Sequence, residues 1–343
     1  MNSFGRLLRV SIYGESHGAG VGVVLDGCPP GLPLSAADFA ADLARRQPGA
    51  PGTTLRREAD SVQILSGLFE GRSSGAPLHF YFANADTRSA DYDFVTSVPR
   101  PGHADWTAAL KYSGYNDWRG SGHFSGRLTV GLVAAGVVAK RLLRPARIEA
   151  SLASAGGQAD IAAAVAAAAA AGDSVGGIVA CSVRGLDAGL GEPFFDSVES
   201  LLAHGLFAIP GIRGLEFGDG FAAAAMAGSQ HNDSLVSADG RSASNHHGGV
   251  NGGISNGNEL CFRLAVKPTA SITRPQTSFD LTSGQPTELR IAGRHDVCFA
   301  QRLPVVVEAV TALVLADLVL LRRAVGRPSD FWDEGGGSPE TRP

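Results

Sequence analysis

Two apolar stretches of the chain leave no polar face. In residues 125–143 and 305–325, hydrophobic side chains occur at nearly every helical angle, which is typical of helices buried on all sides. The second stretch carries Glu308 and Asp317, which helical spacing puts on opposite faces. Each carboxylate would cost about 2.5–3.5 kcal/mol at the centre of a bilayer, so we expect this helix to pack inside the protein rather than span a membrane.

Shorter patterns surround these two stretches. Ser35 followed by Asp38 predicts a helix that starts with a capping box and stops at Pro48. Further helices are predicted over residues 162–171 and 196–206. Strand patterns occur over residues 21–25, 61–65, 78–82, 177–183, 260–266 and 288–291. Strands and helices alternate too irregularly for repeated strand–helix–strand units, so we expect one domain over residues 1–325 and a disordered tail over residues 326–343.

Composition narrows the class of partner. The 343 residues include 45 glycines, well above the usual share of about 7%, which indicates loops that turn tightly or approach a ligand closely. The net charge of −4 offers no excess of cations for a nucleic acid or an anionic membrane, whereas a small anion stays compatible. The chain starts without an apolar run of signal-peptide length, and its cysteines, Cys28, Cys181, Cys261 and Cys298, form no closely spaced pair. We therefore expect free thiols and a cytoplasmic protein.

The first cluster with chemical content is Gly14-Glu15-Ser16-His17-Gly18. A histidine between glycines has little side-chain cover, so its ring can face a cavity and donate a proton near neutral pH, although a solvated turn would look the same. These residues also match the Gly-x-Ser-x-Gly elbow of serine hydrolases, with Ser16 as nucleophile. That elbow needs a helix after the serine, and the strand pattern that follows argues against one.

Two further clusters combine cations with tight turns. Arg100, His103 and Asp105 surround a Pro-Gly turn, which could equally be a surface turn. Residues 119–127 form a glycine-rich loop that leads into the first buried helix, and the N–H groups at such a helix start suit an anion such as a phosphate monoester. The loop lacks the lysine of a P-loop and the spacing of a dinucleotide fingerprint.

The last clusters lie toward the C-terminus. His246 and His247 are adjacent within a segment rich in glycine and asparagine, but no spaced Cys, His or carboxylate completes a ligand set, so we expect no metal site. Arg294 and Asp296 share a turn before the last helix. They are candidates for a functional site, although a simple surface ion pair would show the same pattern.

Taken together, these clusters resemble the chorismate synthase family in order, spacing and residue type, from Phe4 to about Leu321. The matching motifs occupy residues 14–18, 26–34, 56–58, 67–71, 100–105, 218–221, 228–230, 267–269 and 293–296. The resemblance implies an α+β fold, a single-domain β-α-β sandwich with long buried helices between mainly antiparallel sheets. It also implies a lyase that converts 5-enolpyruvylshikimate 3-phosphate to chorismate by anti-1,4-elimination of phosphate, the last step of the shikimate pathway, with reduced FMN as cofactor.

The resemblance implies roles for particular residues. His17 would protonate the leaving phosphate, and His103 would stabilise the reduced flavin as an acid or a cation. Asp296 would take up the C6 hydrogen, directly or through the flavin, with Ser16 and Ser125 as relays. The implied flavin contacts are His123, Phe124, Ser125, Pro210, Gly211, Gly252, Lys267, Pro268, Thr269, Ala270, Ser271 and Arg294. The implied substrate contacts are Arg46, Arg56, Arg57, Arg100, Arg127 and Arg302.

The chain departs from the commoner family pattern at four positions. His123, Phe124 and Leu128 replace an arginine, a serine and a glutamate, and Gly52 replaces an arginine, which weakens the case for a bound NADP nucleotide. The resemblance further implies a homotetramer. The sequence leaves open whether the chain reduces its own flavin with NADPH or depends on an external flavin reductase. A serine hydrolase and a non-catalytic flavin- or phosphate-binding protein are the alternative functions.

Overall fold

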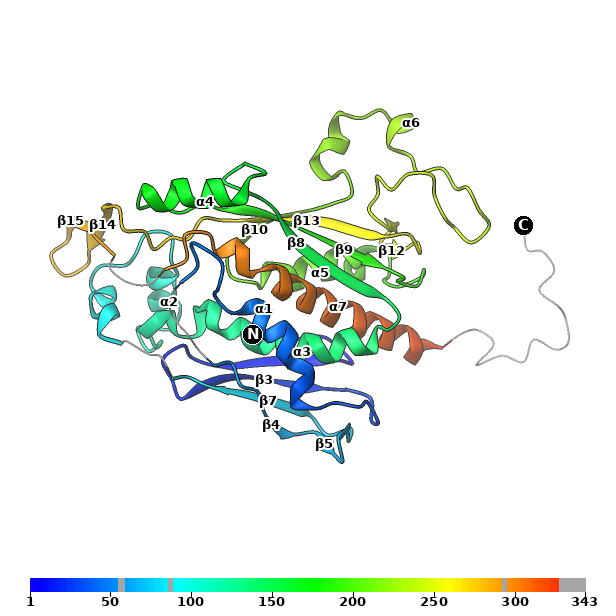
Figure 1. The fold of residues 1–343 in the computed structure, drawn as a ribbon, viewed down its shortest axis with the longest axis horizontal. Helices are drawn as coiled ribbons and strands as arrows, with labels where there is room; N and C mark the ends of the chain where they lie inside the picture. Colours follow the sequence, from blue (N-terminus) through cyan, green and yellow to red (C-terminus); the bar gives the residue numbers. More distant parts are fainter. Residues whose placement is uncertain (55–58, 86–88, 292–294, 327–343) are drawn as a thin grey trace, which may run out of the picture.

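The computed structural model describes residues 1–54, 59–85, 89–291 and 295–326. Two antiparallel sheets form its outer layers, and long helices lie between them (Figure 1). The expected β-α-β sandwich is therefore confirmed. Residues 327–343 of the expected tail lie outside the described part of the chain.

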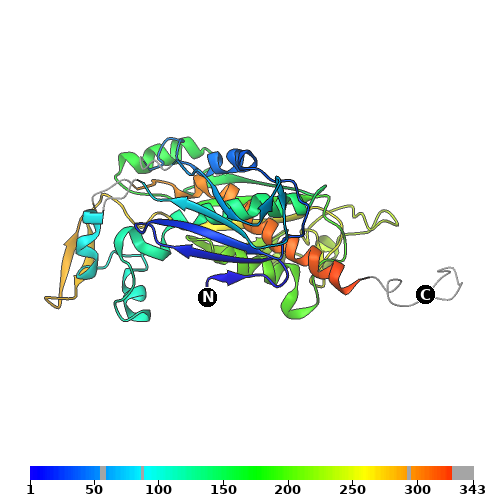
Figure 2. The same cartoon turned by 90° about the horizontal axis from the view of Figure 1, so that it is seen from below.

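The first sheet contains the N-terminal strands. Its order is β1 (Ser3–Phe4), β2 (Arg9–Gly14), β3 (Gly20–Asp26), β7 (Leu78–Ala83) and β4 (Gln63–Ser66), and every pairing is antiparallel. In the view from below, this sheet lies in front of the helices (Figure 2). Val21, Val23 and Leu25 of β3 are fully buried, because alternate residues of a strand face the same layer.

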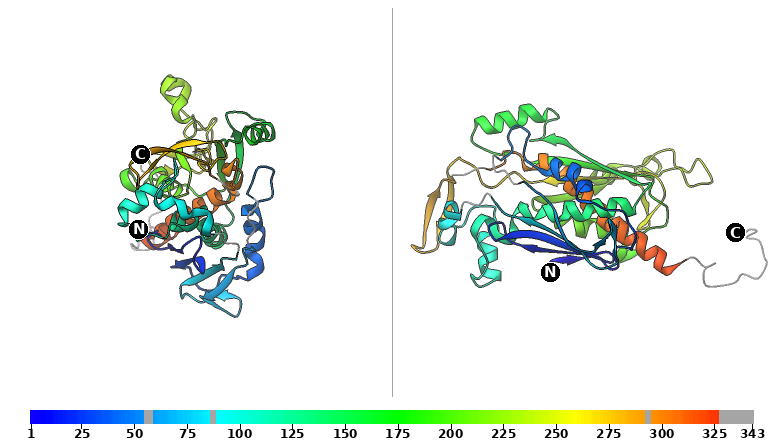
Figure 3. Two further views of the ribbon diagram at one scale, coloured as in Figure 1. Left: turned by 90° about the vertical axis from the view of Figure 1, so that its left-hand side faces the viewer. Right: turned by 60° about the horizontal axis from the view of Figure 1, so that its bottom comes forward.

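The second sheet closes the sandwich on the opposite side. Its order is β10 (Ile212–Phe217), β13 (Leu260–Val266), β9 (Gly177–Arg184) and β8 (Arg147–Ala155). Seen end-on, the helical layer separates the two sheets (Figure 3). Strands β2, β8 and β10 were not among the predicted elements. In β8 the pattern Arg-Ile-Glu-Ala-Ser-Leu-Ala-Ser-Ala alternates weakly, because small residues occupy many of its positions.

The middle layer is built on α3 (Thr129–Leu142) and α7 (Pro304–Val325), with α1 (Ala40–Arg46) and α5 (Val198–Phe207) packed beside them. Both predicted apolar helices are confirmed, and α3 is buried from Thr129 through Ala139. At Gly136 a β-carbon would lie 2.3 Å from Cβ of Ala309, so the glycine allows α3 and α7 to approach closely. Among the described residues, α7 is the one helix long and apolar enough to cross a membrane, and it is a core helix, with 78% of its apolar window buried.

The two carboxylates of α7 connect the helix to both sheets. Glu308 accepts hydrogen bonds from Arg45 (2.6 and 2.7 Å), from Lys140 (2.7 Å) and from the backbone N–H of Ala150 in β8 (3.0 Å). Burial opposes ionisation of Glu308, but Arg45 and Lys140 hold its pKa below the usual value. On the opposite face, Asp317 accepts three backbone N–H groups of residues 6–8, just before β2, at 2.8 to 2.9 Å. The two carboxylates therefore lie on opposite faces of α7, as expected, and each one bonds the helix to the backbone of a neighbouring segment.

The remaining elements are short. They are α2 (Asp105–Lys111), α4 (Ile161–Ala170), α6 (Gly228–His231), β5 (Leu68–Phe69), β6 (Arg72–Ser73), β11 (Val250–Asn251), β12 (Ile254–Ser255), β14 (Gln276–Asp280) and β15 (Gln285–Leu289). Helical turns of the 3-10 type cover Ala36–Phe39, Ser89–Thr96, Arg119–Phe124, Gly126–Leu128, Phe194–Asp196, Gly220–Ala225 and Phe299–Arg302. The predicted cap before α1 is confirmed, because the Asp38 carboxylate accepts the Ser35 backbone N–H at 2.7 Å. Helix α2 and the β14–β15 hairpin project at the same end of the molecule (Figure 1).

Candidate active site

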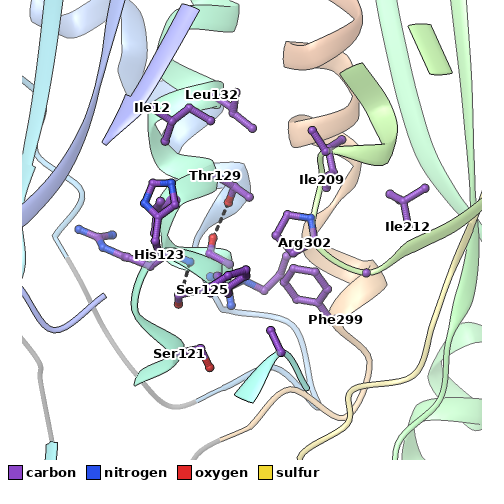
Figure 4. A pocket seen from close by; sticks show the side chains of 18 of the residues that line it. Ile12, Ser121, His123, Ser125, Thr129, Leu132, Ile209, Ile212, Phe299 and Arg302 are labelled. Carbon is purple, nitrogen blue, oxygen red and sulfur yellow. Dashed lines mark hydrogen bonds between the residues drawn. The ribbon is translucent and has the colours of Figure 1, made fainter. Parts of the chain in front are cut away.

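A cavity of about 900 Å³ opens between the two sheets, at the N-terminal end of α3. Ser121, His123 and Ser125 lie on one side of it, and Ile209, Phe299 and Arg302 lie opposite (Figure 4). Its volume falls in the upper part of the range of about 300–1,000 Å³ usual for ligand sites. One part of the lining is apolar, with Ile12, Leu132 and Ile212, and another carries several arginines, a lysine and histidines.

His17 lies just behind this lining. Its Nδ1 is 3.0 Å from Oγ of Ser89, and its ring meets Tyr92 edge to face at 5.4 Å between centroids. Gly120, which lines the cavity, lies so close that a β-carbon there would be 2.4 Å from Cδ2 of His17. The neighbouring Ser16 is completely buried, and the chain continues from it into β3 rather than into a helix. The serine-hydrolase elbow is therefore ruled out.

The turn of residues 100–105 brings its charged groups together, as predicted. The Asp105 carboxylate accepts Nε and Nη2 of Arg100, both at 2.8 Å, and the backbone N–H of Arg100 at 2.9 Å. His103 lies on the same turn, and its Nε2 is 2.7 Å from Oγ of Ser271. Burial, and then the charge of Arg100, lower the pKa of His103 to about 3. This low pKa favours a neutral imidazole, and the expected role of His103 as an acid or a cation beside the reduced flavin stays a prediction.

The glycine-rich loop uses backbone conformations that favour glycine. Gly120, Ser121 and Gly122 all have positive φ, and a β-carbon on Gly122 would lie within 1.9 Å of the carbonyl oxygen of Asp117. The loop carries His123, whose Nδ1 is 2.8 Å from the carbonyl oxygen of Gly14. Because a carbonyl oxygen only accepts, Nδ1 carries the proton. Ser125 follows as the N-cap of the next turn, where its Oγ accepts the backbone N–H of Arg127 at 3.3 Å.

Arginines with few acidic partners line one wall. Arg46 and Arg127 both donate to the buried Asp60, Arg46 at 2.5 Å. Burial opposes ionisation of Asp60, but these two guanidinium groups hold its pKa below the usual value. Burial lowers the pKa of Arg46 to about 10, which leaves it charged at neutral pH. Nε of Arg46 is buried and makes no hydrogen bond to the described residues.

Asp296 lies at the same wall. Its carboxylate accepts the backbone N–H of Thr54 at 2.8 Å and Nη1 of Arg302 at 3.2 Å. Nε of Arg302 in turn donates to the carbonyl oxygen of Arg46 at 3.0 Å. The carboxylate is thus fixed at the cavity surface by two hydrogen-bond donors, in the same group as the arginines.

The segment after β13 forms the facing wall. Lys267, Pro268, Thr269, Ala270 and Ser271 all line the cavity, as do Pro210 and Gly211 after α5. Nζ of Lys267 donates to the carbonyl oxygen of Gly102 at 2.6 Å, which connects this wall to the turn of His103. Partial burial, and then the nearby Arg213, lower the pKa of Lys267.

Most of the expected site residues meet at this cavity. Its lining includes Arg46, Arg100, His103, His123, Phe124, Ser125, Arg127, Pro210, Gly211, Lys267, Pro268, Thr269, Ala270, Ser271, Asp296 and Arg302, with Ser16 and His17 directly behind. Gly252 is separate, because it lies in the β11–β12 hairpin. Arg56, Arg57 and Arg294 lie outside the described residues. His246 and His247 are also separate, and their Nδ1 atoms lie 2.7 and 2.9 Å from the carboxylates of Asp219 and Asp233.

The sequence did not single out Asp60, Asn84 and Tyr92, which also belong to the site. Asp60 neutralises part of the charge of Arg46 and Arg127, and Tyr92 lines the cavity beside His17. Asn84 joins the loop of His17 to Arg127. A polar residue directly after a buried strand was the available signal for Asn84, whereas Asp60 and Tyr92 lie in stretches without a strong pattern.

This arrangement, with arginines, a lysine and histidines around a cavity between two antiparallel sheets, defines an α+β enzyme site for a small polyanion. Comparison with known proteins gives the particular family. The chorismate synthase family model matches residues 8–320, and the chain belongs to this family of shikimate-pathway lyases, which act on a phosphate ester.

Individual relatives agree with this assignment. The chain is 55% identical over 328 residues to a chorismate synthase of Chitinophaga pinensis, covering 95% of this chain and 99% of that protein. It is 46% identical over 359 residues to a chorismate synthase of Desulfovibrio desulfuricans, covering 95% and 98%. A crystal structure of a chorismate synthase matches the fold with a TM-score of 0.71 at 24% identity, covering 93% of each chain.

Proposed function

We propose that this chain eliminates phosphate from 5-enolpyruvylshikimate 3-phosphate to form chorismate, with reduced FMN bound in the same cavity. The substrate carries one phosphate and two carboxylates, so its site needs more cationic than anionic groups. Arg46, Arg127 and Arg302 face two carboxylates, Asp60 and Asp296, which leaves a surplus of positive charge among these described groups.

The observation that carries the proposal is the buried Nε of Arg46, which has no hydrogen-bond partner among the described residues. A buried N–H donor without an acceptor costs about 1–3 kcal/mol, and more on a charged group. Arg46 lines the cavity, and an anionic oxygen bound beside it would satisfy this donor. We therefore assign Arg46, Arg127 and Arg302 to the anionic groups of the substrate.

The cavity also suits FMN. Its volume accommodates more than a single small ligand, and its apolar part offers a surface for a planar ring. We assign Lys267, Ser271 and His123 to the polar edges of the flavin, because all three line the cavity and two of them already bond across its walls. When bound in its reduced form, FMN supplies electron density to the substrate, which an elimination without net oxidation can use and return.

The protein groups are placed to handle protons. His17 is held by Ser89 and Tyr92 directly behind Gly120, which lines the cavity, and we assign it to protonation of the departing phosphate. We assign Asp296 as the base, because its carboxylate is held at the cavity surface by Thr54 and Arg302. Because burial lowers the pKa of His103, we assign it a hydrogen bond to the flavin edge rather than a charge.

We further propose a homotetramer in the cytoplasm. Phe194, Phe195 and Phe221 are each more than four-fifths exposed, which favours their burial against another copy. Sedimentation of the purified protein tests this, because a monomer would contradict it.

The source of the reduced flavin needs a separate test, in which NADPH and oxidised FMN are added to the protein anaerobically. Bleaching of the flavin would show that the chain reduces FMN itself, and no bleaching would indicate that a separate reductase supplies it.

One experiment tests the reaction itself. The protein is mixed anaerobically with chemically reduced FMN and the phosphate ester, and both chorismate absorbance and released phosphate are followed. We expect equal amounts of the two products, with many turnovers per flavin and no net flavin oxidation. Flavin binding without phosphate release would mean that the chain is only a binding protein, and one flavin oxidised per chorismate would contradict the redox-neutral mechanism.

A further inference from the structure

We propose that Asn84 is a positioning residue that holds the His17 loop in register with Arg127. This inference rests on the proposed function, because it assigns a mechanical partner to the proton donor of that reaction. Asn84 directly follows β7 and lies at the junction of two site segments that are far apart in sequence.

The side-chain amide of Asn84 joins three groups. Its Nδ2 donates to the carbonyl oxygen of Glu15 at 2.9 Å and to that of Gly18 at 3.0 Å. Its Oδ1 accepts Nε of Arg127 at 3.1 Å. The two carbonyl groups flank Ser16 and His17, so both amide hydrogens are used on the turn that presents the imidazole.

The orientation of this amide follows from its partners. Carbonyl oxygens only accept hydrogen bonds and a guanidinium only donates them, so Nδ2 must face Glu15 and Gly18, and Oδ1 must face Arg127. Aspartate has the same shape as asparagine but cannot donate to the two carbonyl groups. It would retain the acceptor for Arg127, which separates the two functions of the amide.

The sheet does not need this side chain. Pairing between β3 and β7 already extends from Leu25 and Leu78 to Gly20 and Ala83, and the backbone N–H of Asn84 adds a bond to Ala19 at 3.2 Å. Beyond this point the loop is no longer part of the ladder, and the Asn84 amide sets its position relative to Arg127. Arg127 also donates to Asp60, a bond in which the amide takes no part.

The test compares Asn84→Ala and Asn84→Asp with wild type in the anaerobic assay. Asn258→Asp is the matched control, because Asn258 also clamps a loop, donating to the carbonyl oxygen of Gly240 and accepting the backbone N–H of Ser242, both at 3.1 Å, away from the cavity. We expect both Asn84 variants to lower kcat by about 10- to 100-fold, the cost of displacing a catalytic group by about 1 Å, with KM changed by less than about threefold. The control should retain wild-type kcat, and thermal unfolding should be similar in all variants.

A double variant shows whether Asn84 acts through His17. In the His17→Ala background, Asn84→Ala should lower kcat by less than about twofold further, because the group that it positions is already gone. Independent, multiplicative losses would overturn the proposal, and so would a wild-type kcat in Asn84→Asp, which would show that only the bond to Arg127 matters. Failure of the proposed function looks different, because wild type would then form no chorismate, or His17→Ala would be fully active.

Discussion

Gly120→Ala tests whether the reaction depends on the position of the His17 imidazole. A β-carbon at Gly120 would lie 2.4 Å from Cδ2 and 2.5 Å from Nε2 of His17, whereas ordinary contact begins at 3.4 Å. The imidazole must therefore move by about 1 Å away from Gly120, or the loop must retreat. A displacement of this size costs about 10²-fold in a reaction that depends on orientation, so we expect kcat to fall by about 10- to 100-fold.

The backbone contribution must be separated from the clash. Gly120 has φ +57, and alanine in this left-handed region costs about 1–2 kcal/mol of stability. Gly284 has φ +70, and a β-carbon added there would meet no described atom within 4 Å, so Gly284→Ala carries a similar backbone cost without a clash. The measurements are kcat and thermal unfolding for both variants. Equal kcat values in Gly120→Ala and Gly284→Ala would refute the reasoning.

Three further outcomes follow from the same cavity. Asp60→Asn leaves Arg46 and Arg127 without their shared counter-charge and should lower the free energy of unfolding, measured by urea titration, by about 3–5 kcal/mol; a change below about 1 kcal/mol would contradict the buried pairing. Burial lowers the pKa of His103 to about 3, below the usual value of about 6.5. Between these two pH values the imidazole binds a proton in the unfolded chain but not in the folded one. The free energy of unfolding therefore falls as the pH falls through this range. His103→Gln should therefore lose less stability than wild type between about pH 7 and pH 5, and parallel losses would refute the assignment. His123→Phe removes the proposed hydrogen bond from His123 to FMN, which is worth about 1–1.5 kcal/mol, and should weaken FMN binding by about tenfold. The dissociation constant is measured by quenching of flavin fluorescence. An unchanged value would place His123 outside the flavin site.

The helices and strands of the core were largely predictable, because burial on all sides leaves a simple pattern. Helices α3 and α7 are apolar at nearly every position, and β13 has the bounds that the sequence predicted. Strands β2 and β10 were missed for a physical reason. Each has one half-buried face and carries glycine and charged residues, so the apolar alternation on which strand prediction depends is weak.

The cavity lining was predictable as a set, but its electrostatics were not. Glycine-flanked histidines and arginines in turns indicate a ligand site, yet the ionisation of each group depends on neighbours that are remote in sequence. His103 has a low pKa because it is buried beside Arg100, and a sequence pattern does not record burial of a turn. Gly252, which the family resemblance implied as a flavin contact, forms part of a hairpin outside the cavity lining.

The acidic residues explain how a chain with net negative charge can hold a polyanion. Asp105 pairs with Arg100 and neutralises its charge within the cavity wall. Asp60 is shared by Arg46 and Arg127. These ion pairs orient the arginines before any ligand binds. Sharing one carboxylate between two guanidinium groups fixes both side chains and still leaves positive charge for the substrate. A one-to-one pairing would orient the arginines equally well but would cancel the positive field that the proposed function requires for the phosphate.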